Sequence, residues 1–217
     1  MTTLERLFSP AAGPISGLNT LELPGLWLPT GRVVACDPLV YSNPQPFTRT
    51  CPPGRYSVYL HLLPDDELIA YAELRISTAA VARWEMAVNA RQDPATLAAD
   101  EIFGYPVDAG AGCFMDETTV ALLDQHDADL QAELGDDYIS YFDNYVDDEL
   151  FRGPTATGHD HCLLQPYPDK ENNAAVFQSG YGDGFYATYV GLDAGGQPVK
   201  FVTEFIEAED AVLPPQP

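Results

Sequence analysis

The sequence feature that most constrains the fold is a glycine-rich stretch at residues 179–186, Ser-Gly-Tyr-Gly-Asp-Gly-Phe-Tyr. Its glycines occupy every second position inside a pattern that is otherwise typical of a β-strand. A strand-like run precedes the stretch at residues 174–178, and another follows at residues 185–190. Glycine within a strand pattern marks a bulge, a left-handed backbone position or the close approach of another group. Asp183 is therefore expected to lie on a sharply bent backbone.

Frequent turns predict a β-rich fold built from short elements. The 217 residues include 19 Pro and 17 Gly, and 46% of the chain is hydrophobic, which is enough for a packed core. Alternating apolar residues predict a strand at 31–38, an antiparallel hairpin at 55–76 and a strand at 82–88. Within the segment 174–206, residues 185–192 and 198–206 are expected to form a further hairpin around the Gly-Gly turn at 193–197. His61 lies opposite the apolar face of the first hairpin and is expected on the surface.

Helical spacing of apolar residues is confined to the middle of the chain and predicts helices near 94–103, 116–134 and 137–150. Asp116 is a suitable N-cap for the second of these helices, and Gly135 is a suitable terminator. The fold class that we predict is α+β, with an antiparallel β-sheet or sandwich and a few helices packed at one side.

The domain organisation follows from the same patterns. Residues 1–30 contain a short amphipathic turn and Pro-Gly-punctuated coil, and we expect an N-terminal extension there. Residues 31–206 are expected to form a single α+β domain, because no linker or repeat interrupts them. Residues 207–217 form an acidic, proline-rich tail that is expected not to fold.

Charge is the most unusual property of the composition. The chain has 33 acidic and 10 basic residues, which gives a formal net charge of −23. Such a charge repels nucleic acid and anionic membranes, whereas it attracts a basic protein or a cation. The alternative is that the charge serves solubility alone. No apolar run approaches the roughly 20 residues of a membrane span, and the N-terminus lacks the pattern of a signal peptide, so we expect a cytoplasmic protein.

The acidic residues are concentrated in the predicted helices. The segment between Arg91 and Arg152 contains sixteen acidic residues and neither Lys nor Arg. Like charges four residues apart each weaken a helix by a few tenths of a kcal/mol. The first functional hypothesis is therefore a non-enzymatic binding protein, such as an immunity or antitoxin-like factor, which binds a basic protein partner. The residues expected to bind that partner are Asp136, Asp137, Asp147 and Asp148.

The second hypothesis uses the aspartates of two glycine-spaced segments. Asp108, Asp116 and Asp183, with Asp37 as a possible fourth ligand, would supply hard oxygen ligands for Mg or Ca. The chain would then be a metal-dependent hydrolase or an ion-binding domain. Paired carboxylates can also perform acid–base chemistry. The structural alternative is that these side chains accept hydrogen bonds from nearby backbone amides in turns while glycine takes positive φ.

Motifs of other enzyme classes do not occur in the sequence. The glycine spacing lacks the helix that follows a dinucleotide-binding loop, and there is neither a P-loop nor a Gly-x-Ser-x-Gly elbow. The third hypothesis is a carbohydrate-binding β-sandwich that uses Tyr181, Phe185 and Tyr186.

The four cysteines lie far apart without Cys-x-x-Cys spacing, which predicts free thiols rather than a zinc site. A disulfide between Cys36 and Cys51 remains an alternative if their strands are neighbours. Cys113 could pair with a histidine as a catalytic dyad, although no motif supports that pairing.

A series of short motifs occurs in a fixed order along the chain. The most specific is Ser179-Gly180-x-Gly182-Asp183-Gly184-x-Tyr186; the others are Asp37-Pro38, Pro53-Gly54-x-Tyr56, Trp84-Glu85-Met86-Ala87, Tyr105-x-Val107-Asp108-Ala109-Gly110, Phe114-x-Asp116 and Gly191-Leu192-Asp193. In these motifs the chain resembles an uncharacterised bacterial family, domain of unknown function 4241, over about residues 31–206. The resemblance implies a compact, single-domain cytoplasmic protein and carries no established catalytic residue.

Overall fold

The fold is described from a computed structural model that covers residues 2–10, 15, 17–40, 43–64, 68–99, 101–151 and 161–207. The elements in chain order are α1 (Thr3–Phe8), β1 (Asn19–Leu28), β2 (Val33–Cys36), β3 (Gly54–Leu62), β4 (Ile69–Arg75), β5 (Arg83–Met86), η1 (Pro94–Thr96), β6 (Tyr105–Val107), β7 (Ala111–Asp116), α2 (Glu117–Leu134), η2 (Gly135–Asp137), η3 (Phe142–Val146), α3 (Asp147–Phe151), β8 (His161–Leu164), β9 (Ala174–Gln178), β10 (Gly184–Tyr186), β11 (Thr188–Leu192) and β12 (Pro198–Glu204). The fold is α+β, as the sequence predicts.

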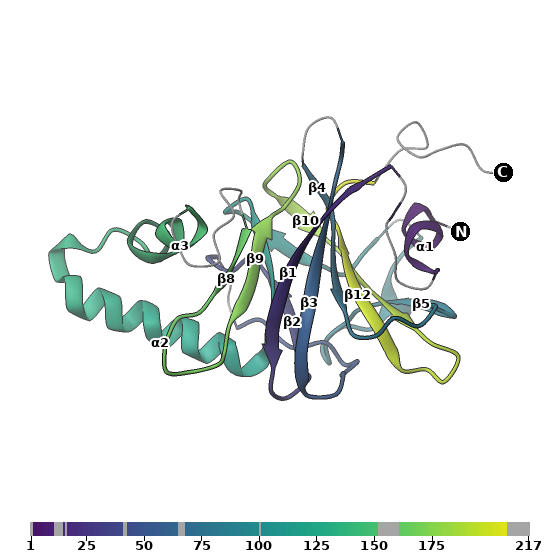
Figure 1. Cartoon of the computed structure of the whole chain (residues 1–217), viewed down its shortest axis with the longest axis horizontal. Helices are drawn as coiled ribbons and strands as arrows, with labels where there is room; N and C mark the ends of the chain where they lie inside the picture. The colour runs from purple at the N-terminus through teal and green to yellow at the C-terminus, as the bar shows by residue number, and fades with distance from the viewer. Residues whose placement is uncertain are drawn as a thin grey trace.

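Two antiparallel sheets pack face to face. The larger sheet has the strand order β1-β3-β4-β12-β11-β5, the smaller has the order β2-β7-β9-β8, and β10 pairs with β6 in a short ribbon. The main core lies between the two sheets and includes Leu60 and Phe201 from the larger sheet and Phe114 and Phe177 from the smaller one. A second core covers the other face of the smaller sheet, where α2, η3 and α3 pack. Figure 1 shows these helices on the side of the molecule opposite α1.

Strand β1 lies within the region expected to be an N-terminal extension, residues 1–30. It is an edge strand that pairs with β3. The register shifts between Leu23 and Leu26, where Gly25 has a φ of 96°. A Pro-Gly pair resembles a turn in sequence, but proline is compatible with an edge strand at a bulge. The bulge places Leu23 and Leu26 on the same buried face.

The β predictions are confirmed in most places. The strand at 31–38 is β2, the hairpin at 55–76 is β3 and β4, and the strand at 82–88 is β5. Within the segment 174–206, the hairpin expected across the Gly-Gly turn is confirmed, because β11 pairs with β12 in the larger sheet. The preceding strand β9 belongs to the smaller sheet instead. The glycine-rich stretch separates the two parts and moves the chain from one sheet to the other.

The helix predictions are confirmed at 116–134 and only in part elsewhere. The side chain of Asp116 caps α2 by accepting from the Thr118 amide, and Gly135 ends it with a φ of 55°. Within 94–103 only the short 3-10 turn η1 forms, because Asp93 caps a chain that becomes extended again at Leu97. The segment 137–150 contains the π-turn η3 followed by α3. None of the helices in the described ranges is long and apolar enough to cross a bilayer.

A cluster of charged side chains is buried on the outer face of the larger sheet, beneath α1. Glu73 accepts hydrogen bonds from Arg75 (2.9 Å) and contacts Lys200 (3.2 Å) and His61 (3.0 Å). His61 is fully buried, contrary to the surface position expected from the alternation in its strand, because Phe8 of α1 packs over its ring. Burial alone would raise the pKa of Glu73, but hydrogen bonds from His61 and Arg75 hold it well below its ordinary value.

Replacement of Glu73 by glutamine is expected to destabilise the protein by about 3–5 kcal/mol, because the buried cations lose their counter-charge. Chemical denaturation measures the loss. Glu171→Gln is the matched control, since the Glu171 carboxylate is 69% exposed in its ion pair with Arg55, and its effect should stay within about 1 kcal/mol. Equal effects of the two substitutions would contradict the role of the buried cluster.

The buried cluster also predicts that stability decreases with acidification. Burial lowers the pKa of His61 below 6.5 in the folded chain, so the unfolded chain binds a proton more readily. The stability contributed by neutral His61 is complete above pH 6.5 and is lost as the pH falls toward the folded pKa. The free energy of unfolding of the wild type should therefore decrease between pH 7 and pH 5, and His61→Gln should flatten that dependence. A slope that the substitution leaves unchanged would contradict this assignment.

Candidate functional site

Asp116 has a structural role at the junction of β7 and α2. Its buried carboxylate accepts four hydrogen bonds, two from the amide and hydroxyl of Thr30 and two from those of Thr118. Both carboxylate oxygens are therefore engaged, and they join the start of α2 to the loop before β2. This arrangement is the turn-and-cap alternative that the sequence left open.

Asp108 and Asp183 lie at the opposite end of β7, where the two glycine-rich segments meet. Asp183 accepts a hydrogen bond from the Gly110 amide at 3.2 Å, and the Gly110 carbonyl accepts from the Ser179 amide. Asp37 is buried and accepts from the amides of Asp108 and Ala109 at 3.0 and 2.9 Å. The two glycine-rich segments are therefore neighbours at this end of β7.

Asp116 is too far from the other two aspartates to share an ion with them. It ends β7, whereas Asp108 precedes that strand, and the six residues Ala111–Asp116 of an antiparallel strand span about 17 Å. Among the described residues no group of three or more His, Cys, Asp or Glu side chains is arranged to hold a metal ion. The aspartates of the second hypothesis are thus divided between two ends of the sheet.

The glycine-rich stretch forms a tight turn. Gly180 and Gly182 have φ values of 58° and 104°, which residues other than glycine rarely adopt. A Cβ on Gly180 would also lie 2.9 Å from the side chain of Ile206. The Tyr186 hydroxyl closes the turn by donating to the Gly182 carbonyl at 2.8 Å. The glycines are therefore required to connect β9 with β10.

Asp116→Ala is expected to cost about 2–4 kcal/mol, because it removes an N-cap and two further hydrogen bonds to Thr30. Asp108→Ala should change stability by no more than about 0.5 kcal/mol, since the Asp108 side chain is exposed. Urea denaturation of both variants measures the difference. A large loss in Asp108→Ala together with a small one in Asp116→Ala would contradict these roles.

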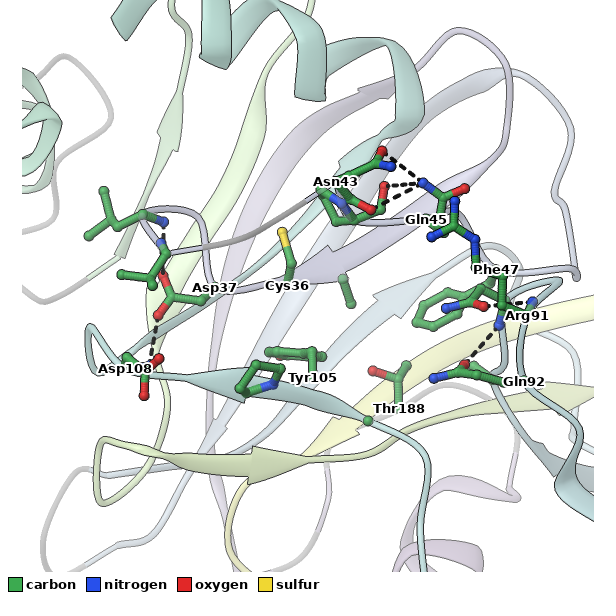
Figure 2. Close-up of a pocket in the computed structure, with 18 residues that line it drawn as sticks. Cys36, Asp37, Asn43, Gln45, Phe47, Arg91, Gln92, Tyr105, Asp108 and Thr188 are labelled. Atoms are coloured by element: carbon green, nitrogen blue, oxygen red, sulfur yellow. Dashed lines mark hydrogen bonds between the residues drawn. The ribbon is translucent and has the colours of Figure 1, made fainter. Parts of the chain in front are cut away.

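A pocket of about 770 Å³ opens beside Asp37, at one end of the sandwich. Its described lining comes from residues within 35–40, 43–47, 87–92 and 104–108, together with Thr188. Figure 2 shows Asp37 and Asp108 at one end of the pocket and Arg91 and Gln92 beside Phe47 at the other. A pocket of this volume is within the usual range of small-molecule sites.

The cysteines do not provide a nucleophile in this pocket. Cys36 lies in its wall, and its sulfur is 3.7 Å from the sulfur of Cys113 on the neighbouring strand. The hydrogen bond with Cys113 and burial raise the pKa of Cys36 well above its ordinary value, so the thiol is protonated at neutral pH. All four cysteines are free, and the neighbour of Cys36 is Cys113 rather than Cys51.

The second feature of interest is an acidic arm, which we define as residues 117–151. It comprises α2, η2, η3 and α3, and α2 runs outward from the smaller sheet (Figure 1). Only Thr119 and Leu123 are buried among the 18 residues of α2. The arm contains eleven acidic residues and neither Lys nor Arg.

Some acidic side chains of the arm accept hydrogen bonds from tyrosine hydroxyls, and others are exposed to solvent. Asp127 accepts a hydrogen bond from the Tyr138 hydroxyl, and burial together with this bond raises the pKa of Tyr138 to about 12. Asp129 accepts from the Tyr167 hydroxyl at 2.6 Å. Asp136 and Asp137, in contrast, are exposed and form no ion pair within the described ranges. These two aspartates are free to meet a partner.

The partner-binding residues expected from the sequence lie on two parts of the arm. Asp136 and Asp137 are in η2, and Asp147 and Asp148 begin α3. Between the two pairs, Ile139 is 74% exposed and Phe142 is 37% exposed. The sequence analysis did not single out these apolar residues, because it expected one helix over 137–150, whereas the structure forms the π-turn η3 there.

A family model described as "Protein of unknown function (DUF4241)" matches residues 26–203. The chain belongs to this family. The match includes β2, β7 and the glycine-rich turn, and it includes the whole of the acidic arm. No curated protein and no solved structure matched the chain.

Proposed function

We propose that this member of the family is a non-enzymatic binding protein whose acidic arm binds a basic protein partner. The observation that carries the proposal is that the exposed carboxylates of Asp136 and Asp137 lie beside exposed apolar side chains, those of Ile139 and Phe142. They follow a helix, α2, in which only two of the described residues are buried. Exposed apolar residues surrounded by polar ones are typical of protein interaction sites. Complementary charge would raise the association rate and exclude acidic partners.

The low burial of α2 supports this proposal. A helix with two buried residues among 18 gains little from packing, and its like charges weaken it further. A basic partner would relieve that repulsion and would cover Ile139 and Phe142 at the same time. Immunity proteins and antitoxins that mask a basic toxin use chemistry of this kind, and we place the protein in that functional class.

A cytoplasmic location is part of the proposal. The four thiols are unpaired although the sulfurs of Cys36 and Cys113 lie within contact distance, and this is consistent with a reducing compartment. An antitoxin-like protein acts where its partner is made.

Charge reversal of the arm tests the proposal. The full chain should capture a basic protein from a lysate of its source cells, and the affinity for that purified protein should fall steeply from about 0.05 to about 0.5 M salt. The variant Asp136→Lys, Asp137→Lys, Asp147→Lys, Asp148→Lys should weaken the purified complex at least about a hundredfold by calorimetry. Its melting temperature should stay equal or rise, because repulsion within the arm is reduced.

A matched control changes the net charge equally at exposed acids outside the arm: Glu22→Lys, Glu101→Lys, Glu171→Lys, Glu207→Lys. This control should retain the affinity of the wild type. Equal weakening in both variants would mean that net charge alone governs association and would contradict a specific site on the arm. A partner that the arm variant binds as tightly as the wild type would also contradict the proposal.

A further inference from the structure

The pocket beside Asp37 contains an arginine, Arg91, that has no counter-ion among the residues that the structure describes. Arg32, Arg49, Arg55, Arg75 and Arg83 each contact a carboxylate at 2.6–3.1 Å. The guanidinium of Arg91, which lines the pocket, contacts no carboxylate among the described residues. Arg91 is exposed to solvent at the pocket, and because it has no ion pair within the described ranges, its guanidinium is available to an anion from solution.

Two amide side chains next to Arg91 reinforce this donor character. The Asn89 side-chain oxygen accepts from the Arg91 amide at 2.9 Å, and the Gln92 side-chain oxygen accepts from the Asn89 amide at 3.0 Å. Both acceptor oxygens are therefore occupied. The two NH₂ groups have no acceptor within the described part of the chain, and both residues line the pocket with Arg91. The side chains of Arg91, Asn89 and Gln92 thus present hydrogen-bond donors to the pocket.

The remainder of the pocket provides an apolar surface and an acidic far end. Phe47 stacks on Phe201 with ring centroids 5.7 Å apart, so the core fixes its ring in the pocket wall. Ala35 and Ala87 add further apolar lining. The Asp37 carboxylate already accepts hydrogen bonds from backbone amides, whereas the Asp108 side chain is exposed at the far end (Figure 2).

We propose that this pocket binds a small carboxylic acid with an apolar or aromatic body. The carboxylate would accept hydrogen bonds from Arg91 and from the side-chain NH₂ groups of Asn89 and Gln92, and the body would lie against Phe47. A guanidinium matches a carboxylate through two parallel hydrogen bonds. A phosphate dianion is disfavoured, because it carries twice the charge into a strongly acidic protein with one unpaired arginine at the site. This inference is independent of the acidic arm.

Matched pairs of probes test the proposal with the full chain. The acids 3-phenylpropionate, 4-phenylbutyrate and indole-3-acetate are each compared with their uncharged primary amides by ¹H–¹⁵N NMR titration. At least one acid should shift the amide resonances of residues 87–92 and 104–108 at saturating concentration. That acid should bind about ten- to a hundredfold more tightly than its amide, since a charged hydrogen-bond pair contributes that much to affinity.

The substitution Arg91→Gln removes the charge while it leaves the pocket wall in place. It should weaken the acid about ten- to a hundredfold and leave the amide unaffected. Arg83→Gln is the matched control, because Arg83 is an exposed arginine outside the pocket, and it should bind the acid as the wild type does. Both variants should keep the wild-type melting temperature to within a few degrees.

Three results would overturn the proposal: no acid shifts the pocket resonances, acid and amide bind equally, or Arg91→Gln binds the acid as the wild type does. The arm variant with four aspartates replaced should bind the acid normally. A variant that no longer binds the basic partner but still binds the acid, or the reverse, therefore distinguishes failure of one proposal from failure of the other.

Discussion

The smaller sheet is buried on both faces, and this constraint determines where polar groups can lie. Alternate residues of β2 face the main core and the helical core, as Val33 and Val34 do. A strand of this kind has no solvent-facing side, so carboxylates are placed where strands begin and end. Asp37 follows β2, and Asp116 ends β7. Because the two strands are antiparallel, the two aspartates lie at opposite ends of the sheet.

The same register explains both functional regions. At the Asp37 end, the carboxylate binds the backbone amides of two loops and fixes one side of the pocket. At the Asp116 end, the carboxylate caps α2 and ties the start of the acidic arm to Thr30. Asp37 and Asp116, two of the aspartates that the sequence offers as metal ligands, therefore position the pocket and the arm.

The sequence predicts the fold class and most strands, because half-buried strands retain a strict alternation of apolar residues. It fails at β1, where Pro24-Gly25 has the composition of a turn but forms a bulge. It also fails at His61, since alternation describes one strand and cannot include α1, which covers the outer face. Burial of a strand face by a segment that is distant in sequence is a tertiary effect, and a local residue pattern cannot predict it.

The pocket could not be predicted for a similar reason. Its lining comes from five separate parts of the chain, and no one of them forms a motif. Arg91 is notable only because its partners are absent among the described residues, and this becomes visible when the ion pairs of the other arginines are known. The cluster Asn89-Ala-Arg-Gln92 was nevertheless a usable signal, because it is polar and follows a predicted strand.

The distribution of cations links the stability of the body to the charge of the arm. Glu73 engages Arg75 and Lys200, and Glu85 engages Arg49 and Arg83. A buried carboxylate requires cations or several hydrogen-bond donors, whereas an exposed one is screened by water and salt at little cost. With only 10 bases in the chain, the body uses most of them, and the arm carries eleven acids without a base of its own, although Arg32 of the body pairs with Glu117. The arm tolerates this charge because α2 extends into solvent, and that same exposure makes its carboxylates accessible to a cationic surface.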